Sequence, residues 1–229
     1  MIKAVIFDVD GTLIDSVDLH AEAWVEAFAH FGIKTDGAEV RRHIGEGADR
    51  LMPAFVPNDM LKTRGEEIDA FRSGLFKKKY LRQVRPFPGV RALFERVRSA
   101  GQTIILGSSC KADELESYKK IAGIADMVDG ATTSDDADRS KPSPDIFEAA
   151  LEILAPISAG ETIVVGDTPY DAKAARRAGI ATIGLLCGGW SELELRDAGC
   201  IAVYRDPKDL LENYDSSPLT AKADATPAA

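Results

Sequence analysis

The sequence predicts an α/β fold: a Rossmann-like, doubly wound parallel sheet with an α-helical cap domain inserted after the first strand. Three apolar runs indicate the sheet, at 4–7, 103–107 and 162–166, and they stop at Asp8, Ser108 and Asp167. Continuous apolar runs are typical of parallel strands that helices cover on both faces. Because ligands bind beyond the carboxyl ends of such strands, the three polar residues are expected to meet at one sheet edge.

The segment that follows the first strand has a different character. Residues 16–81 contain no strand pattern, and Trp24, Phe28 and Phe31 recur at helical spacing. Glycines and prolines divide the segment into about four helices, at Gly32, Gly37, Gly45, Pro53 and Pro57. We therefore predict a helical module that interrupts the α/β domain.

Helices and strands alternate again in the second half of the chain. Ser143 followed by Pro144 predicts the N-cap and first turn of a helix that ends near Leu154. Thr168 and Pro169 repeat this signal, and Gly179 predicts the end of that second helix.

The expected division has three parts. Residues 1–15 and 86–214 form the catalytic α/β core, and residues 16–85 form the α-helical cap. Residues 215–229 offer little apolar surface to bury, so we predict a disordered tail.

Composition narrows the possible partners and the compartment. The 229 residues are 45% hydrophobic and 28% charged, as in ordinary globular proteins. A net charge of −9 argues against nucleic acid as a general partner, because duplex phosphates need a basic surface. Cys110, Cys187 and Cys200 are too few for a disulfide framework or zinc site, and no signal peptide or membrane-span pattern occurs. We expect a cytoplasmic protein, with a monomer as the default.

Asp8 and Asp10 are the first candidates for chemistry. Residues i and i+2 of an extended segment face the same way, so both carboxylates are expected on one side of the strand end. Gly11 then permits a sharp turn and a close approach of backbone N–H groups to an anion. An Asx-type turn without function is the alternative for this short motif.

Polar residues also follow the other two strands. Ser108 and Ser109 are expected to open a helix and form an anion site, although a plain helix N-cap is the alternative. Asp167 ends a buried strand and needs a partner there. Asp171 stands at capping-box spacing from Thr168, so a structural role is the alternative for it.

The last candidate is Lys141, which lies before Pro142 and just ahead of a helix. Proline restricts the preceding backbone to extended forms, which helps to aim one ammonium group, although a surface lysine is the alternative. Together with Lys141, the four aspartates at positions 8, 10, 167 and 171 leave about three excess negative charges. A hard divalent cation with oxygen ligands resolves this excess, which indicates Mg²⁺.

These motifs, in this order and spacing, resemble those of the haloacid dehalogenase-like hydrolase superfamily. They are DVDGTLID at 8–15, Ser108, KPSPD at 141–145 and GDTPYD at 166–171. The resemblance covers residues 2 to about 213. The early helical insert resembles the cap of phosphoglycolate phosphatases and β-phosphoglucomutase.

The resemblance implies a role for each residue. Asp8 is the expected nucleophile, which forms a phosphoaspartyl intermediate, and Asp10 is the expected general acid and base. Ser108 and Lys141 are expected to hold the phosphoryl oxygens, with Ser109 and Gly11 beside them. Mg²⁺ is expected to bind Asp8, the Asp10 carbonyl and Asp167, with Asp171 orienting them from behind.

Several reactions of this superfamily compete. Dehalogenases lack an acid at position 10, so a Mg²⁺-dependent phosphatase acting on a small phosphate ester, either a sugar phosphate or phosphoglycolate, is the main prediction. A sugar phosphomutase needs a grip on a second phosphate, for which Arg41, Arg42 or Arg50 are the candidates. No lysine of the cap stands out as the Schiff-base residue of a phosphonatase. A non-catalytic binding protein on the same scaffold is the remaining alternative.

Two further residues lie near these motifs. His20 is a candidate for contact with the leaving group, and the alternative is a packed histidine on the face of Trp24. Cys110 follows the two serines. A helix N-terminus at this place would acidify its thiol. We prefer the interpretation that Cys110 is a small packed residue.

Overall fold

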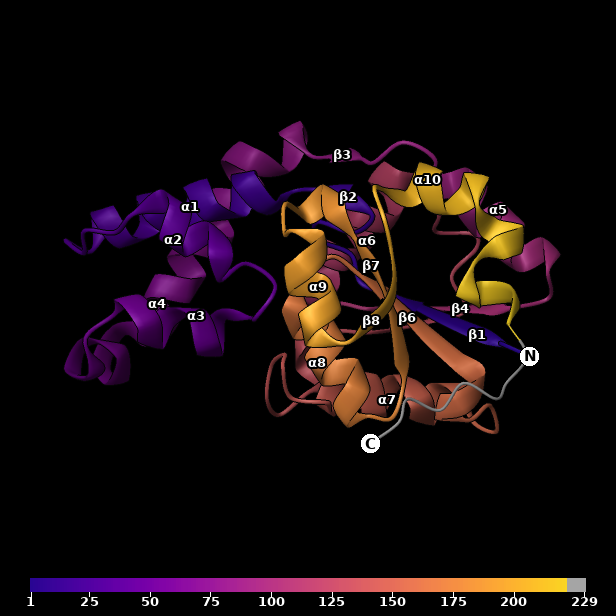
Figure 1. Ribbon diagram of the computed structural model, residues 1–229. Coiled ribbons are helices and arrows are strands. Elements are labelled where there is room, and N and C mark those ends of the chain that lie inside the picture. Colours follow the sequence, from indigo (N-terminus) through magenta and orange to yellow (C-terminus); the bar gives the residue numbers. More distant parts are fainter. Residues whose placement is uncertain (222–229) are drawn as a thin grey trace.

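The computed structural model describes residues 1–221 and confirms the predicted fold class. Its main sheet has six parallel strands (Figure 1). In spatial order they are β5 (Gly130–Thr132), β4 (Thr103–Gly107), β1 (Ala4–Phe7), β6 (Thr162–Gly166), β7 (Ala181–Leu185) and β8 (Cys200–Tyr204). The three runs predicted from the sequence are thus the three adjacent central strands β4, β1 and β6.

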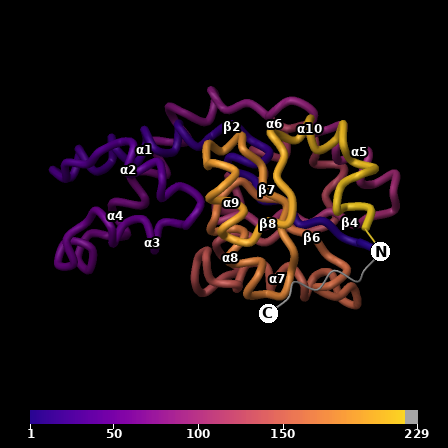
Figure 2. The backbone as a smooth tube through the Cα atoms, in the orientation of Figure 1, coloured from indigo at the N-terminus to yellow at the C-terminus, as the bar shows by residue number. Residues whose placement is uncertain are grey.

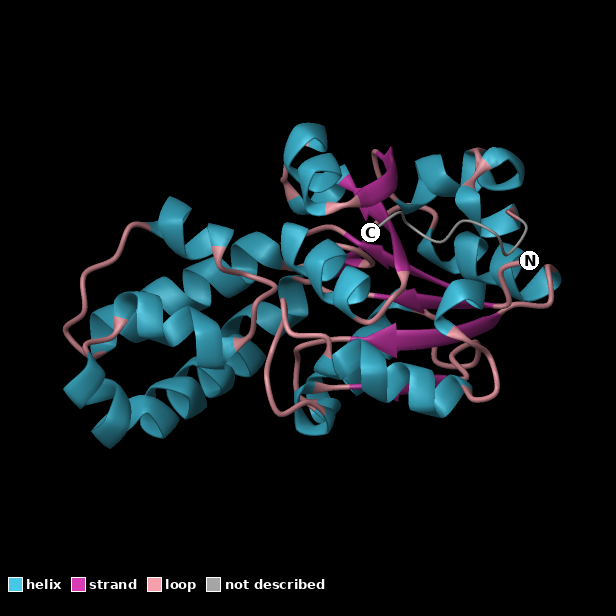
Figure 3. Ribbon diagram, turned by 60° about the horizontal axis from the view of Figure 1, so that its bottom comes forward, coloured by secondary structure: helices cyan, strands magenta, loops and turns pink. Residues whose placement is uncertain are grey.

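Helices cover both faces of this sheet, as Figure 3 shows. One face carries α5 (Val90–Ser99), α6 (Ala112–Ala122) and α10 (Pro207–Glu212). The other carries α7 (Asp145–Leu154) and α8 (Pro169–Arg177), with α9 (Glu192–Ala198) packed beside α8, β7 and β8.

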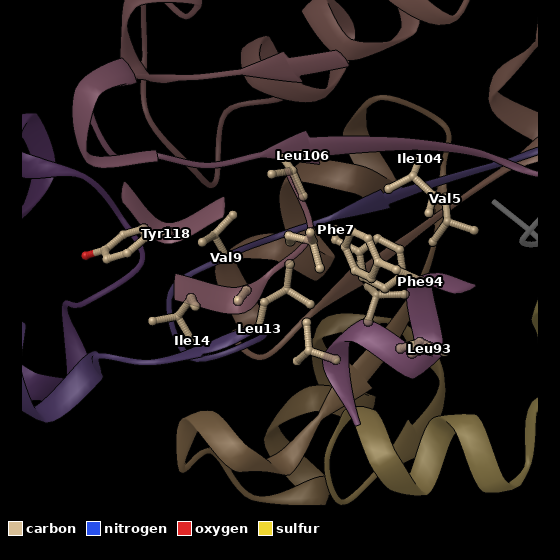
Figure 4. Packing of buried hydrophobic residues seen from close by; sticks show 14 of the residues in the cluster. Val5, Phe7, Val9, Leu13, Ile14, Leu93, Phe94, Ile104, Leu106 and Tyr118 are labelled. Carbon is tan, nitrogen blue, oxygen red and sulfur yellow. The ribbon is translucent and has the colours of Figure 1, made fainter. Parts of the chain in front are cut away.

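Side chains of β1 alternate between the two layers, and all are buried. Val5 and Phe7 pack against α5, where Phe7 and Phe94 stack with ring centroids 4.8 Å apart (Figure 4). Ala4 and Ile6 belong to the core beneath α7 and α8. Since successive residues of a strand face opposite sides, a strand covered on both sides must be apolar throughout.

The helical segment lies beyond the carboxyl ends of the strands (Figures 1 and 2). A short antiparallel ribbon leads into and out of it, formed by β2 (Ile14–Asp15) and β3 (Arg85–Pro86). Between them run α1 (Val17–His30), α2 (Gly37–Arg42), α3 (Ala48–Phe55) and α4 (Asn58–Leu75), then a π-helical turn (Phe76–Tyr80) and a 3₁₀ turn (Leu81–Gln83).

These helices have an apolar core of their own. Trp24, Phe28 and Phe31 are buried in it, as their helical spacing predicts. Pro53 does not separate two helices, because it lies inside α3, whereas Pro57 is the N-cap of α4. Within residues 1–221, no helix is long and apolar enough to cross a membrane.

The prediction of a disordered tail from residue 215 is wrong for residues 215–221. Two 3₁₀ turns follow α10, at Tyr214–Ser216 and Pro218–Thr220, and Leu219 is fully buried in the main core. Gln102 Nε2 donates to the Leu219 carbonyl at 2.8 Å, and the Ile2 amide donates to the Ala221 carbonyl at 3.2 Å. A single leucine in a polar sequence therefore anchors the segment. Residues 222–229 lie outside the described part.

Two helix starts also differ from the prediction. Helix α7 ends at Leu154 as expected but has Pro144, not Ser143, as its N-cap, and the Ser143 hydroxyl instead accepts from Arg50. Helix α6 begins at Ala112 after an N-cap at Lys111, so neither Ser108 nor Ser109 caps it.

Candidate active site

A buried ion pair lies at the end of β1. Lys141 Nζ is 2.5 Å from Asp8 Oδ1 and 2.8 Å from Asp171 Oδ1, and it donates to the Gly107 carbonyl at 3.0 Å. Lys141 is 1% exposed, so it is not the surface lysine of the alternative interpretation. A fully buried ammonium group is stable only when it is paired. Four distant segments thus meet at this lysine.

The pair shifts the titration of both groups. Burial raises the pKa of Asp8 to about 7, and the Asp171 and Asp10 charges add to this, although Lys141 opposes it. The pKa of Lys141 is raised by Asp171 and Asp8 in spite of its burial. The nucleophile predicted from the sequence therefore lies in a site that penalises further negative charge.

Asp167 is the least solvated carboxylate of the site. It is 0% exposed, its Oδ1 accepts from Thr12 at 2.7 Å, and its Oδ2 has no hydrogen-bond partner among the described residues. Burial, Asp8 and Asp171 all raise its pKa. An unpaired buried carboxylate oxygen is costly without a ligand.

Two glycines leave the space that Asp167 occupies. A Cβ added at Gly188 would lie 1.7 Å from Asp167 Oδ2, and one at Gly11 would lie 2.4 Å from it. Gly11 has φ +83°, and its amide donates to the Ile14 carbonyl at 2.8 Å. Its N–H is thus used in the turn, so the expected approach of this N–H to an anion is not seen.

The carboxylates fit a divalent cation. Oxygens of Asp8, Asp167 and Asp171 lie within 4.8 Å of one another, and all three residues are buried. Lys141 alone does not balance their charge. All-oxygen donors and an orphaned carboxylate oxygen suit a hard ion.

Asp171 completes the predicted capping box and also contacts the buried lysine. Its Oδ2 accepts from the Thr168 hydroxyl at 2.7 Å and the Thr168 amide at 3.1 Å, which completes the predicted capping box of α8. Its Oδ1 faces Lys141.

Asp10 has a separate set of partners. Its Oδ1 accepts from Ser16 Oγ at 2.6 Å and lies 3.0 Å from His20 Nε2. Burial opposes ionisation of Asp10, but the His20 charge and the hydrogen bonds of His20 and Ser16 lower its pKa. Two carboxylates separated by one residue thus have pKa values shifted in opposite directions.

His20 is both packed and turned toward Asp10. Its ring stacks on Phe76 with centroids 3.9 Å apart, and it is 7% exposed. Its Nε2 is also 2.9 Å from the Tyr118 hydroxyl, which donates to Glu114 at 2.8 Å. His20 is therefore a packed histidine, as one interpretation expected, and it also contacts Asp10; its contact with a leaving group stays a prediction.

The segment after β4 carries the two serines. Ser108 is buried, and its hydroxyl accepts from the Cys110 amide at 3.2 Å. Ser109 Oγ is buried without a hydrogen-bond partner among residues 1–221. Burial raises the pKa of the Cys110 thiol, and Asp10 and Glu114 add to this, so Cys110 does not have the acidified thiol that a helix N-terminus would give it.

A cavity of about 310 Å³ separates this sheet edge from the cap helices. Asp10 and Ser109 line it from the side of the sheet, and His20, Trp24 and Arg72 line it from the helices.

The three arginines proposed for a second phosphate all have other partners. Arg41 bonds Asp18 at 2.5 Å, and Arg42 bonds Glu194 at 2.8 Å while lying over the Trp190 ring. Arg50 donates to the Ser140 carbonyl at 3.2 Å and to Ser143 Oγ at 3.1 Å. Arg50 thus ties the cap to the loop that carries Lys141.

Comparisons with known proteins point to one protein family. A model of the haloacid dehalogenase-like hydrolase family matches residues 2–179. A phosphoglycolate phosphatase of Rhodospirillum rubrum is 27% identical over 90% of this chain and 88% of its own length. Protein SUPPRESSOR OF QUENCHING 1, chloroplastic, of Arabidopsis thaliana is 27% identical over 98% of this chain, which spans 21% of that relative.

Solved structures agree with this comparison. A hydrolase from Pseudomonas syringae is 29% identical with a TM-score of 0.82, over 96% of this chain and 100% of that one. A putative β-phosphoglucomutase from Bacteroides vulgatus shares the fold, with 24% identity and a TM-score of 0.81 over 94% of this chain and 88% of its own. The chain belongs to the haloacid dehalogenase-like hydrolases.

Sequence reasoning missed several residues of this site. Thr12 stands in the first motif, and its hydroxyl lies within reach of both Asp8, at 3.0 Å, and Asp167. The position of Thr12 inside the first motif was the sequence feature that could have identified it. Gly188, Glu114 and Tyr118 carry no local pattern that sets them apart, because their roles arise only from packing.

Proposed function

We propose that this protein is a Mg²⁺-dependent phosphatase that transfers the phosphoryl group of a small phosphate ester to Asp8 and then to water. The observation that carries the proposal is the buried Asp8–Lys141 pair beside a cavity that Asp10 lines. A nucleophile, a fixed positive charge and a separate acid are the groups that this transfer needs.

The proposed reaction has two steps. An Asp8 oxygen attacks phosphorus, and the ester oxygen leaves with a proton from Asp10. Asp10 then takes a proton from water, which attacks the phosphoaspartate and releases phosphate. Lys141 stabilises the phosphoryl oxygens, with Ser108 and Ser109 on the adjacent strand end. Thr12 fixes the orientation of the Asp8 carboxylate.

Asp8, Asp167 and the Asp10 carbonyl are the proposed metal ligands, with Asp171 behind them. When bound, Mg²⁺ neutralises charge on the transferring group and on these carboxylates. The unpartnered Asp167 oxygen and the glycines that make room for it support this assignment.

We propose residues 16–85 as the cap that selects the leaving group. Their separate apolar core and the β2–β3 ribbon at their base support a unit that moves against the sheet. The three free cysteines are compatible with the cytoplasm that we predict.

The structure offers less support for the alternatives. A phosphomutase needs a grip on a second phosphate, and the three candidate arginines are engaged elsewhere. A non-catalytic relative is disfavoured because every motif residue is present.

Release of phosphate from p-nitrophenyl phosphate tests the proposal. We expect turnover with Mg²⁺, loss of turnover with EDTA, and no turnover in Asp8→Asn. Sugar phosphates that are isomerised without release of phosphate would instead indicate a mutase. An inert wild-type protein across a broad panel of phosphate esters would refute the enzyme proposal.

A further inference from the structure

We infer that the cavity beside Asp10 selects an uncharged, hydroxyl-bearing leaving group and rejects one that carries a carboxylate or second phosphate. The inference rests on the proposed phosphatase function and names the class of its substrate. It is carried by the charges that line the cavity and by the hydrogen-bonding capacity of its carboxylates.

Negative charges outnumber positive ones around the cavity. Five carboxylates line it against two permanent cations and His20, whose charge also acts on Asp10. The acids are Asp10, Asp49, Asp69, Glu114 and Asp138, and the cations are Arg72 and Lys111. Lys141 is close by but is held by Asp8 and Asp171, so it does not offset the excess. An anionic leaving group therefore meets net repulsion.

The two cations do not form a free anion site. Arg72 bonds Asp69 at 3.1 Å, and Lys111 bonds the other Asp69 oxygen at 2.9 Å. The Arg72 guanidinium also lies over the Trp24 ring, 4.9 Å from its centroid. Both cations thus share one carboxylate, which reduces their attraction for a second anion.

A hydroxyl group suits this lining better than a second anion does. It can donate to a carboxylate and can also accept a hydrogen bond, whereas an ionised carboxylate can only accept.

Two acceptors of the lining are available to such a hydroxyl group. Asp49 accepts only a long bond, 3.3 Å, from the Ser140 amide, and Asp138 is exposed in the same region. The cavity volume of about 310 Å³ lies at the small end of ligand sites. If each non-hydrogen atom with its hydrogens takes about 30 Å³, as a water molecule does, the cavity holds about ten such groups. This size suits a sugar or sugar alcohol better than a two-carbon acid.

Matched substrate pairs test this charge selection. Glucitol 6-phosphate and 6-phosphogluconate differ by a hydroxymethyl group in place of a carboxylate, as do 2-hydroxyethyl phosphate and 2-phosphoglycolate. Two excess charges at roughly 8 Å in a water-like medium predict about a sixfold higher kcat/KM for the uncharged member. An equal or higher kcat/KM for the carboxylate-bearing members would overturn the inference.

Charge variants locate the effect. In the double variant Asp49→Asn, Asp138→Asn, the preference should fall to about onefold, because no excess charge remains. Asp197→Asn removes an exposed charge outside the cavity and should keep the full preference. An unchanged preference in the double variant would overturn the charge filter.

The p-nitrophenyl phosphate assay separates the two proposals. If this ester is hydrolysed but 2-phosphoglycolate is preferred over 2-hydroxyethyl phosphate, only the inference fails. If neither the aryl phosphate nor any member of the pairs is hydrolysed, the phosphatase function fails and the inference fails with it.

Discussion

Replacing Gly188 with alanine should displace Asp167 and weaken the proposed metal site. The added Cβ would lie 1.7 Å from Asp167 Oδ2 and 2.4 Å from its Cγ, whereas ordinary contacts begin near 3.4 Å. The φ of Gly188 is outside the left-handed region, so the effect is steric alone. Overpacking of this kind costs about 1–3 kcal/mol. The carboxylate or the turn must also retreat by well over 1 Å, and a misplacement of about 1 Å costs roughly 100-fold in activity.

Two measurements check this prediction. Titration of Mg²⁺ into the p-nitrophenyl phosphate assay should give a half-saturating concentration raised by at least about tenfold. Urea unfolding should show a modest loss of stability. Gly160→Ala is the matched control, because nothing lies within 4 Å of its added Cβ, and it should behave as wild type in both assays. Wild-type Mg²⁺ dependence in Gly188→Ala would refute the assignment of Asp167.

Other changes probe the ion pair, the acid and the tail. Lys141→Met should lower the unfolding free energy of the metal-free protein by about 3–5 kcal/mol, because it leaves buried carboxylates unpaired. The pKa of Asp8 rises from 3.8 to about 7 on folding. Its contribution to the stability of the metal-free protein should therefore be full below about pH 4 and lost as the pH rises through 7. A urea midpoint that rises between about pH 4 and 7 would contradict this prediction. His20→Ala should slow hydrolysis of alkyl phosphates more than of aryl phosphates, whose good leaving groups need less help from Asp10; equal losses would exclude the positioning role. Leu219→Ala should cost about 2–5 kcal/mol in urea unfolding, and a near-neutral effect would show that the tail does not anchor the core.

The fold was largely predictable because its signals are local. Each central strand is buried on both faces, so its apolar run is continuous and ends where the chain leaves the sheet, at Asp8, Ser108 and Asp167. The capping box at Thr168 and Asp171 also depends on residues three apart. Such patterns need no knowledge of the rest of the chain.

The remainder depends on contacts between distant segments. Leu219 lies in a polar sequence, and only its place against the core makes it an anchor. Arg50 donates to residues about 90 positions away, so the closure of the cap on the Lys141 loop has no sequence signal. The contact of His20 with both Asp10 and Phe76 likewise needed the geometry of the turn.

The identity of the phosphorylated residue tests the central claim most directly. Asp10→Asn removes the base that activates water, while an aryl phosphate needs little acid for departure, so the first step should outrun the second. After acid quenching with p-nitrophenyl phosphate and Mg²⁺, mass spectrometry should find one phosphoryl group on the peptide that contains Asp8. The group should be absent when Asp8→Asn is added to that variant. A phosphoryl group on another residue, or turnover that persists without Asp8, would contradict transfer through this aspartate.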